Sequence, residues 1–142
     1  MTSSPLASGG RTEPDGALRA AVEVHESTGG VPSLSVITLA GDLDLYAVPR
    51  MRSAADVALS DSGAAGSARD VVVDVAAVDF VDSAGLGALL ALLRRTTARG
   101  GRLALVGANE RVRRLLAMTG VTSVVSLHAT LGDAVAARST TA

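Results

Sequence analysis

Two adjoining stretches decide the fold: residues 71–75, with the sequence VVVDV, and residues 78–87, with the sequence VDFVDSAGLG. A continuous β-branched run like the first is typical of a strand buried on both faces in the centre of a sheet. From Leu86 onward, leucines recur at positions i, i+3, i+4 and i+7, which is the apolar stripe of a helix packed on a sheet. The sequence therefore predicts a central strand that leads directly into the longest helix, over residues 83–99.

Weaker patterns on either side of this pair predict the other elements. Strands are expected where hydrophobic residues alternate between turn residues, and helices where apolar residues recur every three or four positions. We expect strands over residues 20–26, 34–39, 103–106 and 124–127, and helices that begin near residues 47, 109 and 130. The first two strands should form a hairpin through a turn at residues 28–30. Since helices alternate with strands from the third strand onward, the predicted class is an α/β fold with a mixed β-sheet of about four to five strands.

The length and composition indicate a single domain with short tails. The chain has 142 residues, of which 48% are hydrophobic, and this is enough for one core of ordinary size. Residues 1–17 are rich in Ser, Gly and Pro and carry no periodic apolar pattern, so they are expected to be a flexible N-terminal tail. The predicted domain covers residues 18–138, with a loop over residues 61–69, and residues 139–142 form a C-terminal tail.

The composition also excludes several classes of function. The 13 basic and 14 acidic residues nearly cancel, and there are only two aromatic residues, so neither phosphate-backbone binding nor base stacking is favoured. The chain has no Cys, and all its basic residues are Arg, which excludes disulfides, thiolate metal sites and a catalytic Lys. No signal peptide or membrane-spanning run is apparent. We expect a cytoplasmic protein that binds neither nucleic acid nor membrane.

The densest cluster of unusual residues lies where the central strand meets the longest helix. Asp82 or Ser83 should be the N-cap of this helix, accepting hydrogen bonds from the free N–H groups of its first turn. Gly85 and Gly87 are poor helix formers, and their presence indicates that another group approaches this backbone closely.

Enzyme motifs were tested at the same corner, and none of them fits. The pair Gly85 and Gly87 lacks the third glycine of a dinucleotide-binding fingerprint, and a P-loop needs the Lys that this chain lacks. Ser83 does not lie in a G-x-S-x-G nucleophile elbow, and no pattern ties it to His25 or His128. Both His residues are interpreted as surface or strand-edge positions, and we expect no catalytic residues, no metal and no cofactor.

Several motifs lie in order over residues 20–138: GDLD at residues 41–44, VDV at 73–75, FVDSAGLG at 80–87, GRLALVG at 101–107, VRRLL at 112–116 and TG at 119–120. Together they resemble a known family, the bacterial anti-sigma factor antagonists, which are single STAS domains. The resemblance implies a mixed sheet with helices packed largely on one side.

This resemblance implies partner switching in place of catalysis. In the family, the Ser of the DSAGLG string is phosphorylated by a partner that is both an anti-sigma factor and a GHKL-type serine kinase; here it is Ser83. The unphosphorylated domain binds the anti-sigma factor and frees a sigma factor, and a serine phosphatase reverses the phosphorylation. The partner-binding residues that we predict are Asp42, Asp44, Asp82, Ser83, Gly85, Leu86 and Gly87.

Alternatives remain open at this point. Asp42 and Asp44 are equally well interpreted as turn residues that bond to their own backbone. The domain could instead serve another assembly, such as a stress-signalling complex or a transporter subunit, in which Ser83 is not phosphorylated. A small nucleotide-binding or hydrolytic enzyme that uses the same corner is a third interpretation.

Overall fold

The structure is a computed structural model of the chain, and it describes residues 2–5, 16–26, 33–60 and 69–139. The expected hairpin turn at residues 28–30 lies outside the described residues, as do residues 61–68 of the expected loop and most of both tails. The strands of the described residues are β1 (Thr2–Pro5), β2 (Arg19–His25), β3 (Ser33–Leu43), β4 (Arg69–Val81), β5 (Leu103–Val106) and β6 (Ser126–His128). The helices are α1 (Val48–Ala58), α2 (Ser83–Ala98), α3 (Glu110–Met118) and α4 (Leu131–Ser139), with short 3-10 helices η1 (Leu45–Ala47) and η2 (Val121–Ser123).

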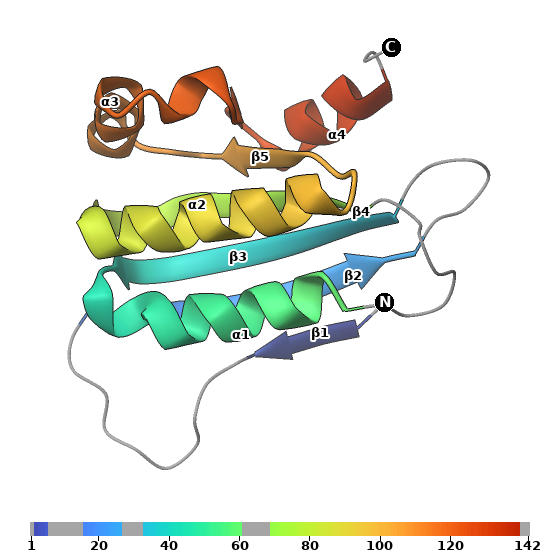
Figure 1. The fold of residues 1–142 in the computed structure, drawn as a ribbon, viewed down its shortest axis with the longest axis horizontal. Helices are drawn as coiled ribbons and strands as arrows, with labels where there is room; N and C mark the ends of the chain where they lie inside the picture. Colours follow the sequence, from blue (N-terminus) through green and yellow to red (C-terminus); the bar gives the residue numbers. More distant parts are fainter. Residues whose placement is uncertain (1, 6–15, 27–32, 61–68, 140–142) are drawn as a thin grey trace.

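The six described strands form one mixed sheet in the order β1-β2-β3-β4-β5-β6 (Figure 1). Strands β1, β2 and β3 pair antiparallel, and β3, β4, β5 and β6 pair parallel. The predicted α/β class and the pairing of the first two predicted strands are confirmed. The last strand begins at Ser126, two residues later than expected, because Val121–Ser123 form η2.

The expectation that residues 1–17 lie wholly in a tail is wrong for Thr2–Pro5. These four residues form β1, which pairs with residues 21–24 of β2. Without this partner, β2 would be the edge of the sheet and would expose a row of unpaired N–H and C=O groups. Strand β1 forms because the edge of β2 is available to pair with it, so the local sequence of the tail could not predict this strand.

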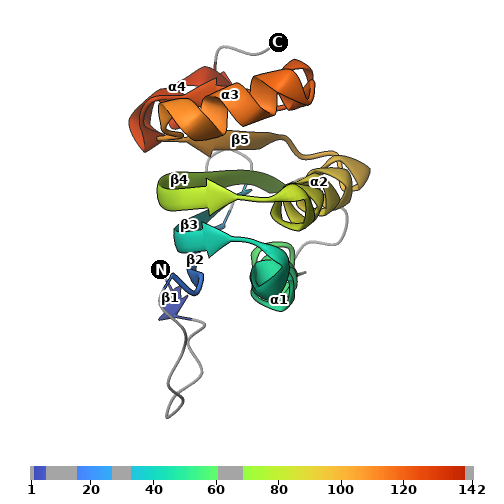
Figure 2. The ribbon, with the colours of Figure 1, turned by 90° about the vertical axis from the view of Figure 1, so that its left-hand side faces the viewer.

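The helices lie mainly on one face of the sheet, as the family resemblance implied. The main hydrophobic core joins Met51 of α1, Leu92 of α2 and Leu116 of α3 to the same face of the sheet. A smaller cluster on the opposite face contains Ala134 of α4 and Val72 of β4. Figure 2 shows α1 and α2 together on one side of the strands.

Strand β4 contributes residues to both hydrophobic clusters, one on each face of the sheet. Val71 and Val73 belong to the main core and Val72 to the smaller one, so the predicted burial on both faces is confirmed. The pairing with β3 shifts register after Asp74, whose Oδ1 accepts a hydrogen bond from the Ala76 N–H at 3.0 Å. Beyond this irregularity the strand continues to Val81, well past the predicted end.

Candidate functional site

The candidate site is built where two neighbouring parallel strands end. Leu43 of β3 lies opposite Val81 of β4, and Asp42 lies opposite Phe80. Parallel strands have their carboxyl ends at the same edge of the sheet, which is the edge where ligands and partners are commonly bound in α/β folds. The segments that follow, η1 after β3 and α2 after β4, are therefore brought together although they are far apart in the sequence.

Asp82 is the residue that fixes this corner. It is the N-cap of α2, with extended backbone angles, and its Oδ1 accepts a hydrogen bond from the Gly85 N–H at 2.8 Å. Its Oδ2 accepts a second hydrogen bond from the Leu45 N–H of η1 at 3.2 Å. Its own N–H donates to the Leu43 carbonyl oxygen at 3.2 Å. The choice between Asp82 and Ser83 as the cap is thus resolved in favour of Asp82.

Ser83 is consequently available for chemistry. It is the first residue of α2, and its side chain is exposed. Because Asp82 performs the capping, the Ser83 hydroxyl is not needed for it, and it makes no hydrogen bond to any part of the chain that the structure describes. An exposed serine hydroxyl at a helix N-terminus can accept a phosphoryl group without breaking an existing interaction.

Gly85 is explained by packing inside the protein. The residue is buried, and a Cβ atom built there would overlap the carbonyl group of Leu43. The close approach that the sequence indicated is therefore that of β3 to α2. Leu86, next to it, is half-buried and packs against the main core.

Gly87 has a different environment. It is exposed, and a Cβ atom built there would meet nothing within 4 Å among the described residues. A glycine inside a helix costs about 1 kcal/mol of stability relative to alanine, and the fold does not require it here. The surface at Gly87 can therefore be approached closely from outside the protein.

Asp42 and Asp44 lie at the same edge of the sheet. Asp42 is still part of β3, so its interpretation as a turn residue is wrong, whereas Asp44 lies in the turn that follows. The Asp42 N–H donates to the Gly16 carbonyl oxygen at 2.7 Å. The Oδ1 atom of Asp44 accepts a hydrogen bond from the Ala47 N–H at 3.1 Å and so caps η1. The turn interpretation of Asp44 is thus observed, and a contact of either carboxylate with a partner stays a prediction.

Sequence reasoning missed the apolar surface of this corner. Leu45 and Tyr46 of η1 are 62% and 86% exposed, and Phe80 at the end of β4 is 46% exposed. A signal was present, because Tyr46 and Phe80 are the only aromatic residues of the chain. Tyr46 lies two residues after the GDLD motif, and Phe80 is the first residue of the FVDSAGLG motif. The sequence analysis did not assign either of them to a surface that binds a partner.

The two His residues lie outside this corner. His25 faces Glu23 on its own strand, with Nε2 and Oε1 3.5 Å apart, and the Nε2 of His128 lies 3.2 Å from the hydroxyl of Ser126. Neither ring is bonded to Ser83. Among the described residues, no group of three His, Asp or Glu side chains is placed to hold a metal ion.

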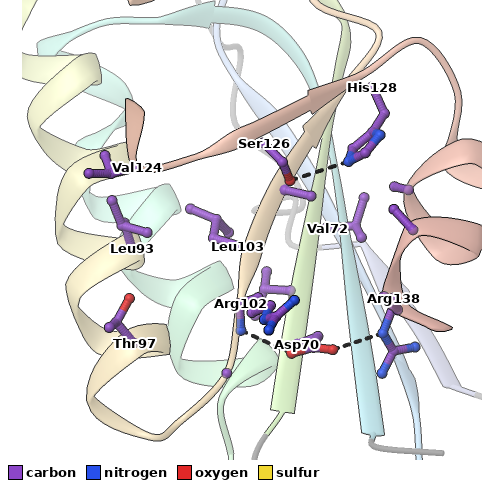
Figure 3. A pocket seen from close by; sticks show the side chains of 15 residues that line it. Asp70, Val72, Leu93, Thr97, Arg102, Leu103, Val124, Ser126, His128 and Arg138 are labelled. Atoms are coloured by element: carbon purple, nitrogen blue, oxygen red, sulfur yellow. Dashed lines mark hydrogen bonds and ion pairs between the residues drawn. The ribbon is translucent and has the colours of Figure 1, made fainter. Parts of the chain in front are cut away.

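A pocket with a volume of about 420 Å³ lies along β5, between the C-terminal half of α2 and helix α4 (Figure 3). At one end, Asp70 accepts hydrogen bonds from the Arg102 N–H at 2.9 Å and from the Arg138 Nε at 2.8 Å. At the other end lies the pair formed by Ser126 and His128. Much of the polar lining is thus bonded to itself, and the pair Asp70 and Arg138 has a clear structural role in attaching α4 to the sheet.

No helix in the described part of the chain is both long enough and apolar enough to cross a membrane.

The fold is a small α/β domain with one mixed sheet and helices mainly on one face of it. The candidate modification site is an exposed serine beside a capping aspartate, at a strand-to-helix corner. The family model of the STAS domain matches residues 21–134. The chain therefore belongs to the STAS domain family.

Several proteins to which the chain is similar are anti-sigma factor antagonists. The chain is 30% identical over 93 residues to the anti-sigma-B factor antagonist of Bacillus subtilis, covering 66% of this chain and 80% of the relative. The crystal structure of an anti-sigma factor antagonist from Mycobacterium paratuberculosis is 27% identical, with a TM-score of 0.65, over 84% of this chain and 94% of that one. The phosphorylated form of SpoIIAA, a Bacillus cell fate determinant, has the same fold at 23% identity, with a TM-score of 0.54, over 80% of this chain and 96% of that one.

Proposed function

We propose that this chain is an anti-sigma factor antagonist whose binding to an anti-sigma factor is controlled by phosphorylation of Ser83. The proposal rests on the observation that Asp82, and not Ser83, caps α2. The Ser83 hydroxyl is exposed and makes no hydrogen bond to the described residues. The names of the relatives supply the class of partner. The chain acts by binding, in the cytoplasm, and catalyses no reaction of its own.

The partner is an anti-sigma factor with GHKL-type serine kinase activity. In the phosphorylation step, the Ser83 oxygen forms a bond to the γ-phosphorus of ATP, the bond from that phosphorus to the bridging oxygen of ADP breaks, and the hydroxyl proton is released. A serine phosphatase hydrolyses the phosphate ester and restores the hydroxyl. The unphosphorylated chain holds the anti-sigma factor, and the sigma factor is then free for transcription.

Physical chemistry favours a switch at this position that leaves the fold intact. A phosphate at a helix N-terminus meets the unpaired N–H groups and the positive end of the helix dipole, so α2 is not destabilised. The phosphate nevertheless adds a charge of about −1.5 to −2 next to the Asp82 carboxylate. A partner that fits closely over Ser83 and Gly87 is then excluded by the volume of the phosphate.

A pull-down with three baits tests this function. The wild-type chain and the variants Ser83→Ala and Ser83→Asp are incubated with the native cytoplasmic extract, and captured proteins are identified by mass spectrometry. We expect a histidine-kinase-like ATPase with wild type and Ser83→Ala but not with Ser83→Asp. With ATP added, phosphate should appear on Ser83 of the wild type only.

Two outcomes would contradict the proposal. Recovery of membrane transport subunits by all three baits would favour a STAS domain of another assembly. Equal capture of the ATPase by wild type and Ser83→Asp would show that charge at Ser83 does not control binding.

A further inference from the structure

Two neighbouring apolar side chains stand out on the surface beside Ser83. Leu45 and Tyr46, both in η1, are 62% and 86% exposed. Single exposed apolar residues are ordinary, but an adjacent pair that includes a tyrosine at a candidate site is typical of the few residues that dominate binding energy in protein interfaces. The fold makes little use of either side chain, because the core contact of η1 is made by Ala47, which is buried.

The turn that carries this pair is held in place from both ends. The Leu45 N–H donates to Asp82 Oδ2 at 3.2 Å, and the Ala47 N–H donates to Asp44 Oδ1 at 3.1 Å. Because the turn is already fixed, it loses less conformational entropy when a partner binds the tyrosine that it carries. The backbone of η1 is thus prepared for binding before any partner arrives.

The charges around the pair indicate the chemistry of the partner. Asp44 directly precedes Leu45, and the Asp82 carboxylate bonds to the Leu45 N–H. The apolar pair is therefore bordered by carboxylates. A complementary surface has an apolar pocket with Arg or Lys side chains at its rim.

We propose that Leu45 and Tyr46 are the anchor with which this chain binds its anti-sigma factor, and that the anti-sigma factor receives them in an apolar pocket rimmed by basic side chains. This inference rests on the proposed function and specifies the surface that the partner recognises. Asp82 couples the anchor to the switch, since the same carboxylate holds both η1 and the first turn of α2. A phosphate on Ser83 repels that carboxylate and weakens its bond to Leu45.

The anti-sigma factor that the wild-type chain captures is purified for the test. Isothermal titration calorimetry then measures its affinity for full-length variants of this chain. We expect Tyr46→Ala to weaken binding by about 30-fold or more, as for an interface hot spot, and Tyr46→Phe to bind within about 3-fold of wild type. The matched control is Met118→Ala at the C-terminal end of α3, a residue that is 78% exposed and whose helix packs mainly against η2 and β4. This control should bind like wild type, and thermal unfolding of each variant confirms that it is folded.

The outcomes separate the inference from the function on which it rests. If Ser83→Asp abolishes binding while Tyr46→Ala and Leu45→Ala both bind within about 3-fold of wild type, Leu45 and Tyr46 are not the binding anchor. The proposed function is then retained. If Ser83→Asp binds as tightly as wild type, the proposed function itself fails.

Discussion

The Oδ2 atom of Asp82 accepts a hydrogen bond from the Leu45 N–H at 3.2 Å, joining two residues that are 37 positions apart in the sequence. The other oxygen of the same carboxylate caps α2 at Gly85. One side chain thus connects the turn after β3 to the helix after β4, and the exposed Ser83 hydroxyl lies directly beside it.

The first prediction separates the roles of Asp82 and Ser83. Asp82→Ala removes a helix cap and the bond to Leu45, so the free energy of unfolding should fall by about 1 to 2 kcal/mol. Ser83→Ala should change it by less than about 0.5 kcal/mol, because this hydroxyl bonds to none of the described residues. Urea denaturation of both variants is the measurement. Equal losses would mean that Ser83 contributes to capping.

The second prediction concerns the two glycines of α2. Gly85→Ala should destabilise the protein by about 2 kcal/mol or more, because its Cβ overlaps the Leu43 carbonyl group and the helix must move. Gly87→Ala should stabilise it by about 0.5 to 1 kcal/mol, since the new methyl group meets nothing among the described residues. Thermal and urea unfolding measure both changes.

The role of Gly87 can also be tested by measuring binding to the anti-sigma factor. Gly87→Ala should weaken the complex with the anti-sigma factor even though it stabilises the free chain, because the partner approaches this backbone closely. Gly132→Ala on α4 is the matched control, being another exposed helical glycine where a Cβ has room. If both variants bind like wild type, the surface at Gly87 lies outside the interface.

The third prediction concerns the attachment of α4. Asp70 and Arg138 have side chains that are each only 16% exposed, and they join β4 to α4. Asp70→Ala leaves Arg138 and the Arg102 N–H without this acceptor, and we expect a loss of about 1 to 3 kcal/mol. The control is Glu110→Ala, which breaks an exposed pair with Arg114 on α3 and should cost at most about 0.5 kcal/mol. Similar effects in the two variants would contradict a structural role for Asp70.

The sequence was sufficient for the elements with strong local signals. Helix α2 was predicted over residues 83–99 and observed as Ser83–Ala98, because its leucine stripe, the corner before it and the glycines at 100 and 101 after it are all local signals. Strand β4 was predicted only over residues 71–75, since the β-branched pattern ends at Val75. Its extension to Val81 depends on pairing with β3 across a register shift, and that pairing has no local signature.

The site was predicted in part. Ser83 and Asp82 could be singled out from the motif, but the choice of the cap depended on backbone angles and on the Leu45 N–H, which comes from another strand end. Gly85 was assigned to a partner because a sequence cannot reveal that Leu43 lies against it.

The most direct test of the account compares the affinity of the anti-sigma factor for the chain phosphorylated on Ser83 and for the unphosphorylated chain, with thermal unfolding of both. We predict that phosphorylation weakens binding by about 100-fold or more, since the phosphate occupies the space into which the partner fits at Ser83 and weakens the Asp82 hydrogen bond that holds η1. The melting temperature should change by less than about 3 °C, because the phosphate lies at the N-terminus of α2. Unchanged affinity, or a loss of affinity that follows from unfolding of the phosphorylated chain, would contradict the account.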